Sequence, residues 1–304
     1  MITRHKFKNI HWVDIELPRE EEITPIAEEF KIHSVVATEL LRPSERAKVD
    51  YHDGYMYLIL HFPKYKHGGN REVPQEIDFI LGKDFIITSH YEPIDAFFDL
   101  SKRLETKSIL EKYENTENAG YIFYHIIRRL YENLEHELDH VTRDLASAEK
   151  EIFAGNELKM VQLLSNINKA LIDFKQPLKV HHEILNSFDT TEVKIFGTKF
   201  EHYTEIIIGE YKRVWALLES NRELLTDLRN TNDSLFSAKT NAIMKNLTIM
   251  SFLTFPLTLM VGVLSMNAES NPLHGMEHQF WIILAIMGVT TAVILSLFKY
   301  KRWI

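Results

Sequence analysis

The sequence contains no cysteine among its 304 residues. Without thiols the chain has no disulfide framework and no thiolate metal site. Basic residues are in the minority, because 35 Lys and Arg stand against 43 Asp and Glu and give a formal net charge of −8. Nucleic-acid binding needs a concentrated basic face, so this composition excludes nucleic acid as an expected partner. It suits cation binding, although solubility alone explains most of these charges.

The N-terminus, MITRHKFKNIHWVDIELPRE, lacks the apolar core of a signal peptide. We therefore expect most of the chain to stay on the side of the membrane where it is made. Charge is missing altogether from residues 247–264 and 280–298, two stretches of 18 and 19 residues. Each is long enough to cross a bilayer as a helix. A buried hairpin of a soluble core is the alternative, but two adjacent uncharged stretches of this length are rare in soluble folds.

Lys and Arg are absent from the loop 267–279 between the two spans. Lys245 precedes the first span, whereas Lys299, Lys301 and Arg302 follow the second. Because basic residues favour the cytoplasmic side, both flanks are expected in the cytoplasm and the loop outside. The sequence thus predicts a multi-pass protein of the inner or plasma membrane with both termini in the cytoplasm.

The first span has a polar seam, which we define by steps of four and three residues along the helix. Hydroxyls occupy four of its positions, and a glycine at another permits close approach of a second backbone. A single helix cannot enclose a pore, so a pore would need several copies around an axis. Alternatively, the hydroxyls bond their own backbone and face a neighbouring helix. The seam consists of Met244, Thr248, Ser251, Phe255, Thr258, Gly262 and Ser265.

The residues before the spans divide into an α/β region and a helical region. Segments 10–17, 55–62, 77–81 and 85–88 are rich in β-branched and aromatic residues and predict strands. These predicted strands indicate an α/β domain over residues 1–115. Thr24-Pro25 predicts the cap and first residue of a short helix.

From residue 119 the hydrophobic periodicity is helical. Gly155-Asn156 predicts a turn between two helices, Pro177 a bend, and 188–197 an irregular connection. From Phe200 onward we expect one very long helix that continues into the first span. The predicted domains are therefore a helical region with a stalk at 116–239 and a transmembrane domain at 240–304.

His136-Glu137-Leu138-Asp139-His140 matches the H-E-x-x-H pattern of zinc peptidases. At 100° per residue both histidines lie opposite the apolar stripe that contains Leu138. We therefore expect them to face solvent and predict no peptidase and no enzyme.

The stretch TNAIMKNLTIMSFLTFPLTLMVGVLSMN, from Thr240, is followed by a short acidic loop and a second span ending in FKYKRWI. Together they resemble the CorA family of divalent-cation transporters. In that family the first span starts with Met-x-x-Leu-Thr, has Pro-Leu-Thr at its centre and ends with Gly-Met-Asn. Segments 81–90 and 173–185 extend the resemblance upstream. Here Ser265-Met266-Asn267 replaces Gly-Met-Asn, which adds a side chain at the narrowest ring.

The resemblance implies a homopentamer in a lipid bilayer whose five first spans line a pore. Asn267 would then present a ring of amide oxygens, which suits Mg²⁺ because this ion prefers oxygen ligands and gives up water reluctantly. Glu269 and Glu277 would concentrate cations at the entrance. Inside, Thr258 would offer hydroxyls and Asn241 a polar ring at the exit. An apolar constriction that closes by dewetting would consist of Phe255, Leu247 and Met244.

In the family, cytoplasmic divalent ions bind between subunits and favour closure. The resemblance makes Asp227 or Asp233 a candidate regulatory ligand, and the alternative is that both are solvated acids. We expect a channel for Mg²⁺ influx driven by the membrane potential, with Co²⁺ or Ni²⁺ as further ions and no permanently bound cofactor. One alternative is a zinc transporter, which Ser265, His274 and His278 favour. The other is a membrane-anchored protein that senses cations without conducting them.

Overall fold

The computed structural model describes residues 1–64, 74–94, 97–98, 100–102, 118–266 and 278–301. It divides into two compact units, Met1–Thr231 and Asn232–Ile304, which are treated separately below. The division of the chain at residues 115 and 239 stays a prediction.

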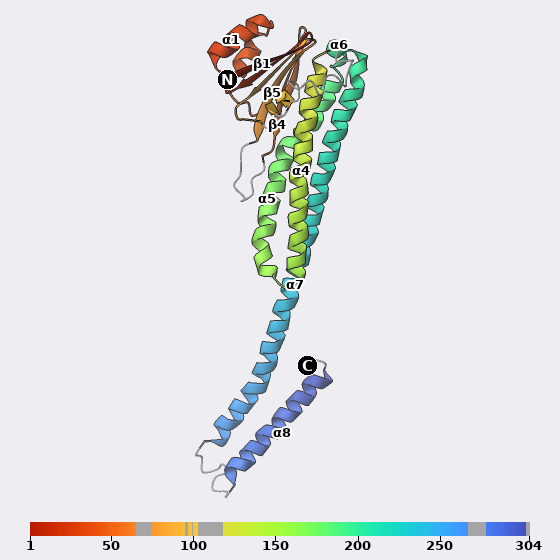
Figure 1. Ribbon diagram of the computed structural model, residues 1–304. Helices are drawn as coiled ribbons and strands as arrows, with labels where there is room; N and C mark the ends of the chain where they lie inside the picture. Colours follow the sequence, from red (N-terminus) through yellow and green to blue (C-terminus); the bar gives the residue numbers. More distant parts are fainter. Residues whose placement is uncertain (65–73, 95–96, 99, 103–117, 267–277, 302–304) are drawn as a thin grey trace. The chain divides into compact units, whose positions relative to one another are not determined.

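A six-stranded mixed sheet forms the N-terminal part of the first unit (Figure 1). Its strand order is β1-β2-β6-β5-β4-β3, and every neighbouring pair is antiparallel except β2 and β6. The four predicted strands are confirmed as β2, β4, β5 and β6. The two others, β1 and β3, were not predicted, because these edge strands are polar and partly exposed. The strands are β1 (Ile2–Phe7), β2 (Ile10–Glu16), β3 (Lys48–His52), β4 (Tyr55–Phe62), β5 (Gln75–Gly82) and β6 (Phe85–His90).

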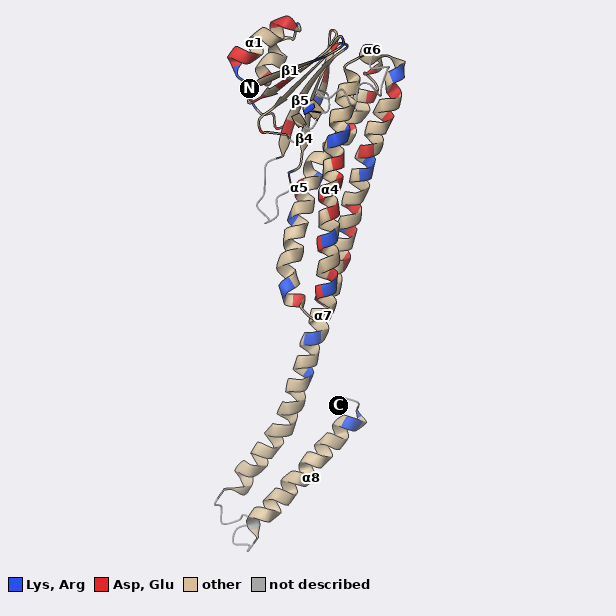
Figure 2. Cartoon of the chain, in the orientation of Figure 1, with Lys and Arg blue, Asp and Glu red and all other residues tan. Residues whose placement is uncertain are grey.

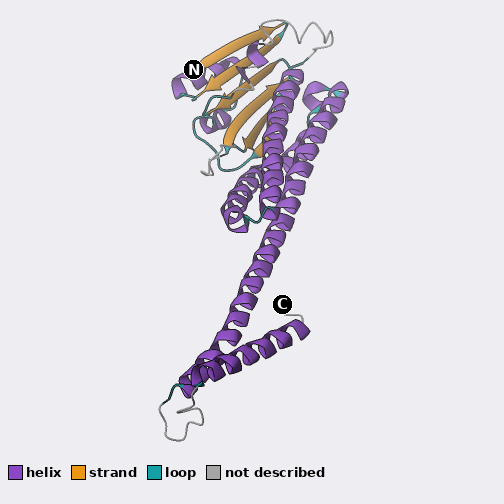
Figure 3. Cartoon of the chain, turned by 60° about the horizontal axis from the view of Figure 1, so that its bottom comes forward, coloured by secondary structure: helices purple, strands orange, loops and turns teal. Residues whose placement is uncertain are grey.

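Helices cover both faces of this sheet (Figure 3). On one face, α1 (Glu20–Glu29) and α2 (Ser34–Glu39) share a buried apolar core with Val13 and Ile80. On the other face, Phe79 of β5 packs edge-on against Phe123 of α4 (Gly120–Phe153), with 5.2 Å between ring centroids. Burial on both faces explains why β4 and β5 are almost continuously apolar.

The predicted start of the first helix at Thr24-Pro25 is wrong. Helix α1 begins at Glu20, with Arg19 as its N-cap, and Pro25 lies inside it. Three glutamates occupy its first turn, where the helix dipole favours negative charge. Thr24 instead donates its hydroxyl to the Glu20 carbonyl over 2.9 Å.

Long helices make up the rest of the first unit, and the last of them continues into the second. The predicted turn at Gly155 is confirmed, since this residue has φ 90° between two helices. Pro177 lies inside α5, which continues past it, and the irregular connection contains the short α6 and η1. The elements are α4 (Gly120–Phe153), α5 (Glu157–Asp189), α6 (Val193–Phe196), η1 (Thr198–Phe200) and α7 (Glu201–Leu264).

The single long helix expected from Phe200 is confirmed, because α7 has 64 residues and includes the first predicted span. The second span is α8 (Gln279–Tyr300). Among the described residues, these two helices are long and apolar enough to cross a membrane. Figure 2 shows their uncharged lengths in tan, with basic residues near the C-terminal end of α8.

Candidate cation pathway

The two histidines of the H-E-x-x-H pattern are exposed on α4, as expected, while Leu138 between them is fully buried. His140 Nδ1 lies 2.7 Å from an Arg143 guanidinium nitrogen. Across the described ranges, no group of three or more His, Asp or Glu is placed to hold a metal ion. The predicted pore residues within the described ranges lie in the second unit.

Helix α8 covers one face of α7 in the second unit. Thr290 of α8 directs its hydroxyl at the sulfur of Met260, 3.7 Å away. The rings of Phe252 and Phe298 meet nearly at right angles, with 6.5 Å between centroids. Half-buried residues repeat along this face at intervals of three and four. They are Ile249, Leu253, Pro256, Met260 and Leu264.

The polar seam lies on the opposite face of α7. At 100° per residue, Phe255, Thr258 and Gly262 are about 140–160° round the helix from Met260. Phe255 is 76% exposed in the single chain. A Cβ added to Gly262 would meet no described atom within 4 Å. From Phe255 to Ser265 the seam is thus open to other chains, whereas Thr248 and Ser251 are half-buried; α8 occupies the far side of the helix.

All four seam hydroxyls donate to carbonyls of their own helix. Thr248 donates to Met244 over 2.8 Å, Thr258 donates to Thr254 over 2.9 Å, and Ser251 and Ser265 follow the same i−4 pattern. This part of the alternative interpretation is confirmed. These hydrogen bonds within the helix do not remove the seam's polarity, because a hydroxyl that donates to its own backbone keeps its oxygen as an acceptor. The water around a cation points its hydrogens outward, so such a row of acceptors matches a hydrated ion.

The other predicted pore residues fall partly within the described ranges. Met244 and Leu247 are exposed, as is Asn241 one turn before Met244. Met266 lies just past the end of α7 and is 61% exposed. The described ranges do not include Asn267, Glu269, His274 and Glu277, while His278 is the N-cap of α8.

Both candidate regulatory acids, Asp227 and Asp233, are exposed on α7. They are six positions apart in the sequence, so they lie about 120° apart round the helix. Leu228, next to Asp227, is buried. The two carboxylates therefore face different flanks, and a single chain does not bring them together on one ion.

Sequence reasoning assigned no role to His181, yet the structure buries it completely. Its Nε2 donates to the His61 carbonyl on β4 over 3.0 Å, and its Nδ1 accepts from the Tyr131 hydroxyl on α4 over 2.8 Å. Burial lowers the pKa of His181 to about 4. The missed signal was its spacing, because His181 continues the buried series Phe174, Leu178, Leu185 and Phe188 at heptad intervals.

Comparisons with known proteins agree with this architecture. A family model described as "CorA-like Mg2+ transporter protein" matches residues 7–302. The chain is 23% identical to the cobalt/magnesium transport protein CorA of Thermotoga maritima, over 96% of this chain and 83% of that protein. It is 25% identical to the putative metal ion transporter YfjQ of Bacillus subtilis, over 96% and 89% of the two chains.

The fold is shared with a solved structure, the complete CorA magnesium transporter of Methanocaldococcus jannaschii. The TM-score is 0.83 at 20% sequence identity, covering 99% of this chain and 94% of that one. The predicted fold class is therefore confirmed. Because the family model spans nearly the whole sequence, the chain belongs to the CorA family of divalent-cation transporters and is a membrane protein with two C-terminal spans.

Proposed function

We propose that five copies of the chain surround a pore lined by the seam of α7, and that this pore conducts Mg²⁺ into the cell. The observation that carries the proposal is the arrangement of faces on α7. Helix α8 covers the side around Met260, so the side with Thr258 and Gly262 remains for contact between copies. Relatives described as magnesium transporters support Mg²⁺ as the ion.

In this proposal the ion enters at Asn267, whose amide oxygens contact it through its water shell. A ring of carboxylates at this point could hold the ion too tightly for it to leave. Glu269 and Glu277 raise the local cation concentration, and the loop that carries them faces outside. Further along, Thr258 accepts hydrogen bonds from the hydrated ion.

The gate in this proposal is apolar. Phe255, Leu247 and Met244 narrow the pore and close it by dewetting, and Asn241 forms the exit ring. A divalent ion moving inward across an inside-negative potential of about 100 mV gains about 4.6 kcal/mol, which makes a chemical fuel unnecessary.

Regulation by cytoplasmic ions would involve Asp227 or Asp233, each reaching toward a different neighbouring subunit because they face different flanks. Replacing both by alanine should weaken closure at high Mg²⁺ and abolish the protection from proteolysis that Mg²⁺ confers. Unchanged transport and unchanged protection would remove this sensor role.

The decisive experiment is Mg²⁺ uptake into proteoliposomes with an imposed inside-negative potential. Asn267→Ala should abolish uptake, while Asn271→Ala, a change of another asparagine in the same loop, should leave most of it. Equal uptake by both variants would contradict the role of Asn267.

The same assay separates the alternatives. Zn²⁺ uptake coupled to protons would replace the proposal by a zinc transporter, for which Ser265, His274 and His278 are the sequence arguments. Absence of flux for every divalent ion would indicate a membrane-anchored cation sensor instead.

A further inference from the structure

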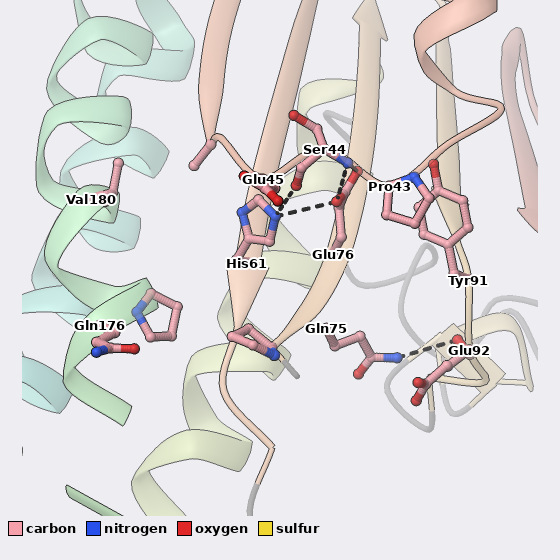
Figure 4. A pocket seen from close by; sticks show the side chains of 13 residues that line it. Pro43, Ser44, Glu45, His61, Gln75, Glu76, Tyr91, Glu92, Gln176 and Val180 are labelled. Carbon is pink, nitrogen blue, oxygen red and sulfur yellow. Dashed lines mark hydrogen bonds and ion pairs between the residues drawn. The ribbon is translucent and has the colours of Figure 1, made fainter. Parts of the chain in front are cut away.

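A cavity of about 500 Å³ lies in the first unit between the sheet and α5 (Figure 4). Its volume falls in the range typical of small-molecule sites, which are mostly apolar with a few convergent polar groups. Among its polar lining residues, Glu76 and His61 contact each other. The apolar walls are Pro43, Ala47, Pro74, Pro177 and Val180.

Glu76 places a buried carboxylate at this cavity, with only 6% of the residue exposed. The backbone N–H of Ser44 donates to both carboxylate oxygens, at 3.0 and 2.7 Å. His61 Nε2 lies 3.2 Å from the second oxygen. A carboxylate has about four acceptor positions, and these partners occupy three of them. Glu76 can therefore accept one more hydrogen bond. A buried charge of this kind favours a cationic partner.

His61 supplies a second polar group. Its Nε2 faces two acceptors, Glu76 and the Ser44 carbonyl at 2.8 Å, so this nitrogen carries a proton. The other ring nitrogen, Nδ1, has no hydrogen-bond partner among the residues that the structure describes. Figure 4 shows it on the side of the ring that faces α5. Burial lowers the pKa of His61, but its hydrogen bonds to Glu76 and the Ser44 carbonyl raise the pKa by more, so Nδ1 is an acceptor at the cavity only while the ring is neutral.

The charge of the lining selects the class of ligand. Glu45 and Glu92 also line the cavity, and no Lys or Arg among the described residues does. Lys64 forms an ion pair with Glu92, but Lys64 does not line the cavity. Anions are therefore disfavoured. A bare metal ion is disfavoured too, because no trio of His, Asp or Glu in the described ranges is placed to hold one.

We propose that this cavity binds a small organic cation, a guanidinium or primary ammonium group on a short apolar body. The cation would hydrogen-bond to Glu76 and His61, and its body would lie against the prolines and Val180. A guanidinium suits this best, because its planar donors match a carboxylate and it is weakly hydrated. All residues of this site belong to the first unit and none belongs to the seam of α7.

The test is calorimetric titration of the full chain in lipid nanodiscs with n-butylguanidinium and with n-butylurea, its neutral isostere. We expect the guanidinium compound to bind and the urea to bind at least about tenfold more weakly, because it lacks the charge. Glu76→Gln should weaken guanidinium binding by a similar factor. Glu149→Gln, which changes an exposed carboxylate on α4, should not alter it.

Glu76→Gln could also disturb residues 43–47 through the lost Ser44 contact, so a second variant is needed. Val180→Trp fills the cavity from α5 without touching the carboxylate, and it should abolish binding while the unfolding temperature stays near that of the wild type. Equal binding of both compounds, or no binding at millimolar concentration, would overturn the proposal. So would undiminished binding in both variants, or displacement of the guanidinium by MgCl₂ or ZnCl₂.

Discussion

His181 is one side chain that connects three elements, α5, β4 and α4. Burial lowers its pKa to about 4, so the native state keeps it neutral while the unfolded chain takes up a proton below the ordinary value of 6.5. Its contribution to stability is therefore complete above pH 6.5 and is lost as the pH falls toward 4.

We predict that His181→Asn flattens the pH dependence of the free energy of unfolding between pH 7 and 4. Wild type should lose about 3 kcal/mol relative to the variant between pH 7 and 4, as the shift of the pKa implies. At pH 7 the variant should be less stable by about 1–3 kcal/mol, because Tyr131 and the His61 carbonyl lose their partner. Urea unfolding of the full chain in detergent, followed by tryptophan fluorescence, measures both. His182→Asn, at the exposed neighbouring position, is the control; an identical pH slope in both variants would contradict the prediction.

The contribution of Glu192 to stability changes with pH in the opposite direction. It is fully buried, accepts a hydrogen bond from the Thr204 hydroxyl, and its Oε1 has no partner among the described residues. Burial raises its pKa to about 7. The native state thus retains a proton that the unfolded chain releases, and the contribution to stability is present below pH 4.5 and is lost as the pH rises through 7.

Glu192→Gln keeps the shape of the side chain but cannot ionise. We predict that it stabilises the protein by about 1–3 kcal/mol at pH 8 and changes little at pH 4. The same unfolding experiment tests it, with Glu183→Gln, at an exposed position on α5, as the control. Destabilisation at pH 8 would show that the ionised carboxylate is accommodated after all.

At the scale of elements, α7 has two faces with different roles. Gly262 lies on the seam face, and Gly288 lies on α8; a Cβ at either would meet no described atom within 4 Å. A single chain should therefore tolerate a larger side chain at both positions. Only the seam glycine is expected to face other copies, where close approach of helices needs a small residue.

We predict that Gly262→Leu lowers Mg²⁺ uptake by at least about tenfold and weakens assembly, because the added side chain separates the packed helices. Gly288→Leu should retain uptake and assembly. Proteoliposome flux and native mass spectrometry of the two variants measure this. Equal loss in both would mean that the seam is not the contact face.

The elements themselves were predictable to different degrees. Strands β4 and β5 were found because burial on both faces leaves long apolar runs in their sequences. The edge strands β1 and β3 were missed, because their residues pair on one side only and tolerate polar side chains. The start of α1 was misplaced because Thr24-Pro25 has the composition of a helix start, while Arg19 and the glutamates after it define the true one.

At the scale of the whole molecule, the proposal requires five chains around one axis. The absence of cysteine allows single reactive positions to be introduced. We predict that Thr258→Cys, on the seam, gives cross-linked dimers with a bismaleimide in membranes, because one cysteine per chain can be joined to the cysteine of one neighbouring chain. Val289→Cys, on α8 and 66% exposed, should give far less. Monomers alone for Thr258→Cys, or an equal yield of dimers for Val289→Cys, would contradict the arrangement.

The sequence alone determined the two membrane spans, the long helix and the family motifs, because uncharged length, periodicity and a motif are properties of contiguous residues. The exposed histidines of α4 followed from the same periodicity. The tertiary structure decided which face of α7 is covered by α8, since that depends on a helix beyond the loop. It also determined the cavity, because the pairing of β4 with β5 brings His61 beside Glu76, and Ser44 contacts the same carboxylate. Contacts between residues far apart in the chain carry no local signature, so burial and pKa at such places follow only from the fold.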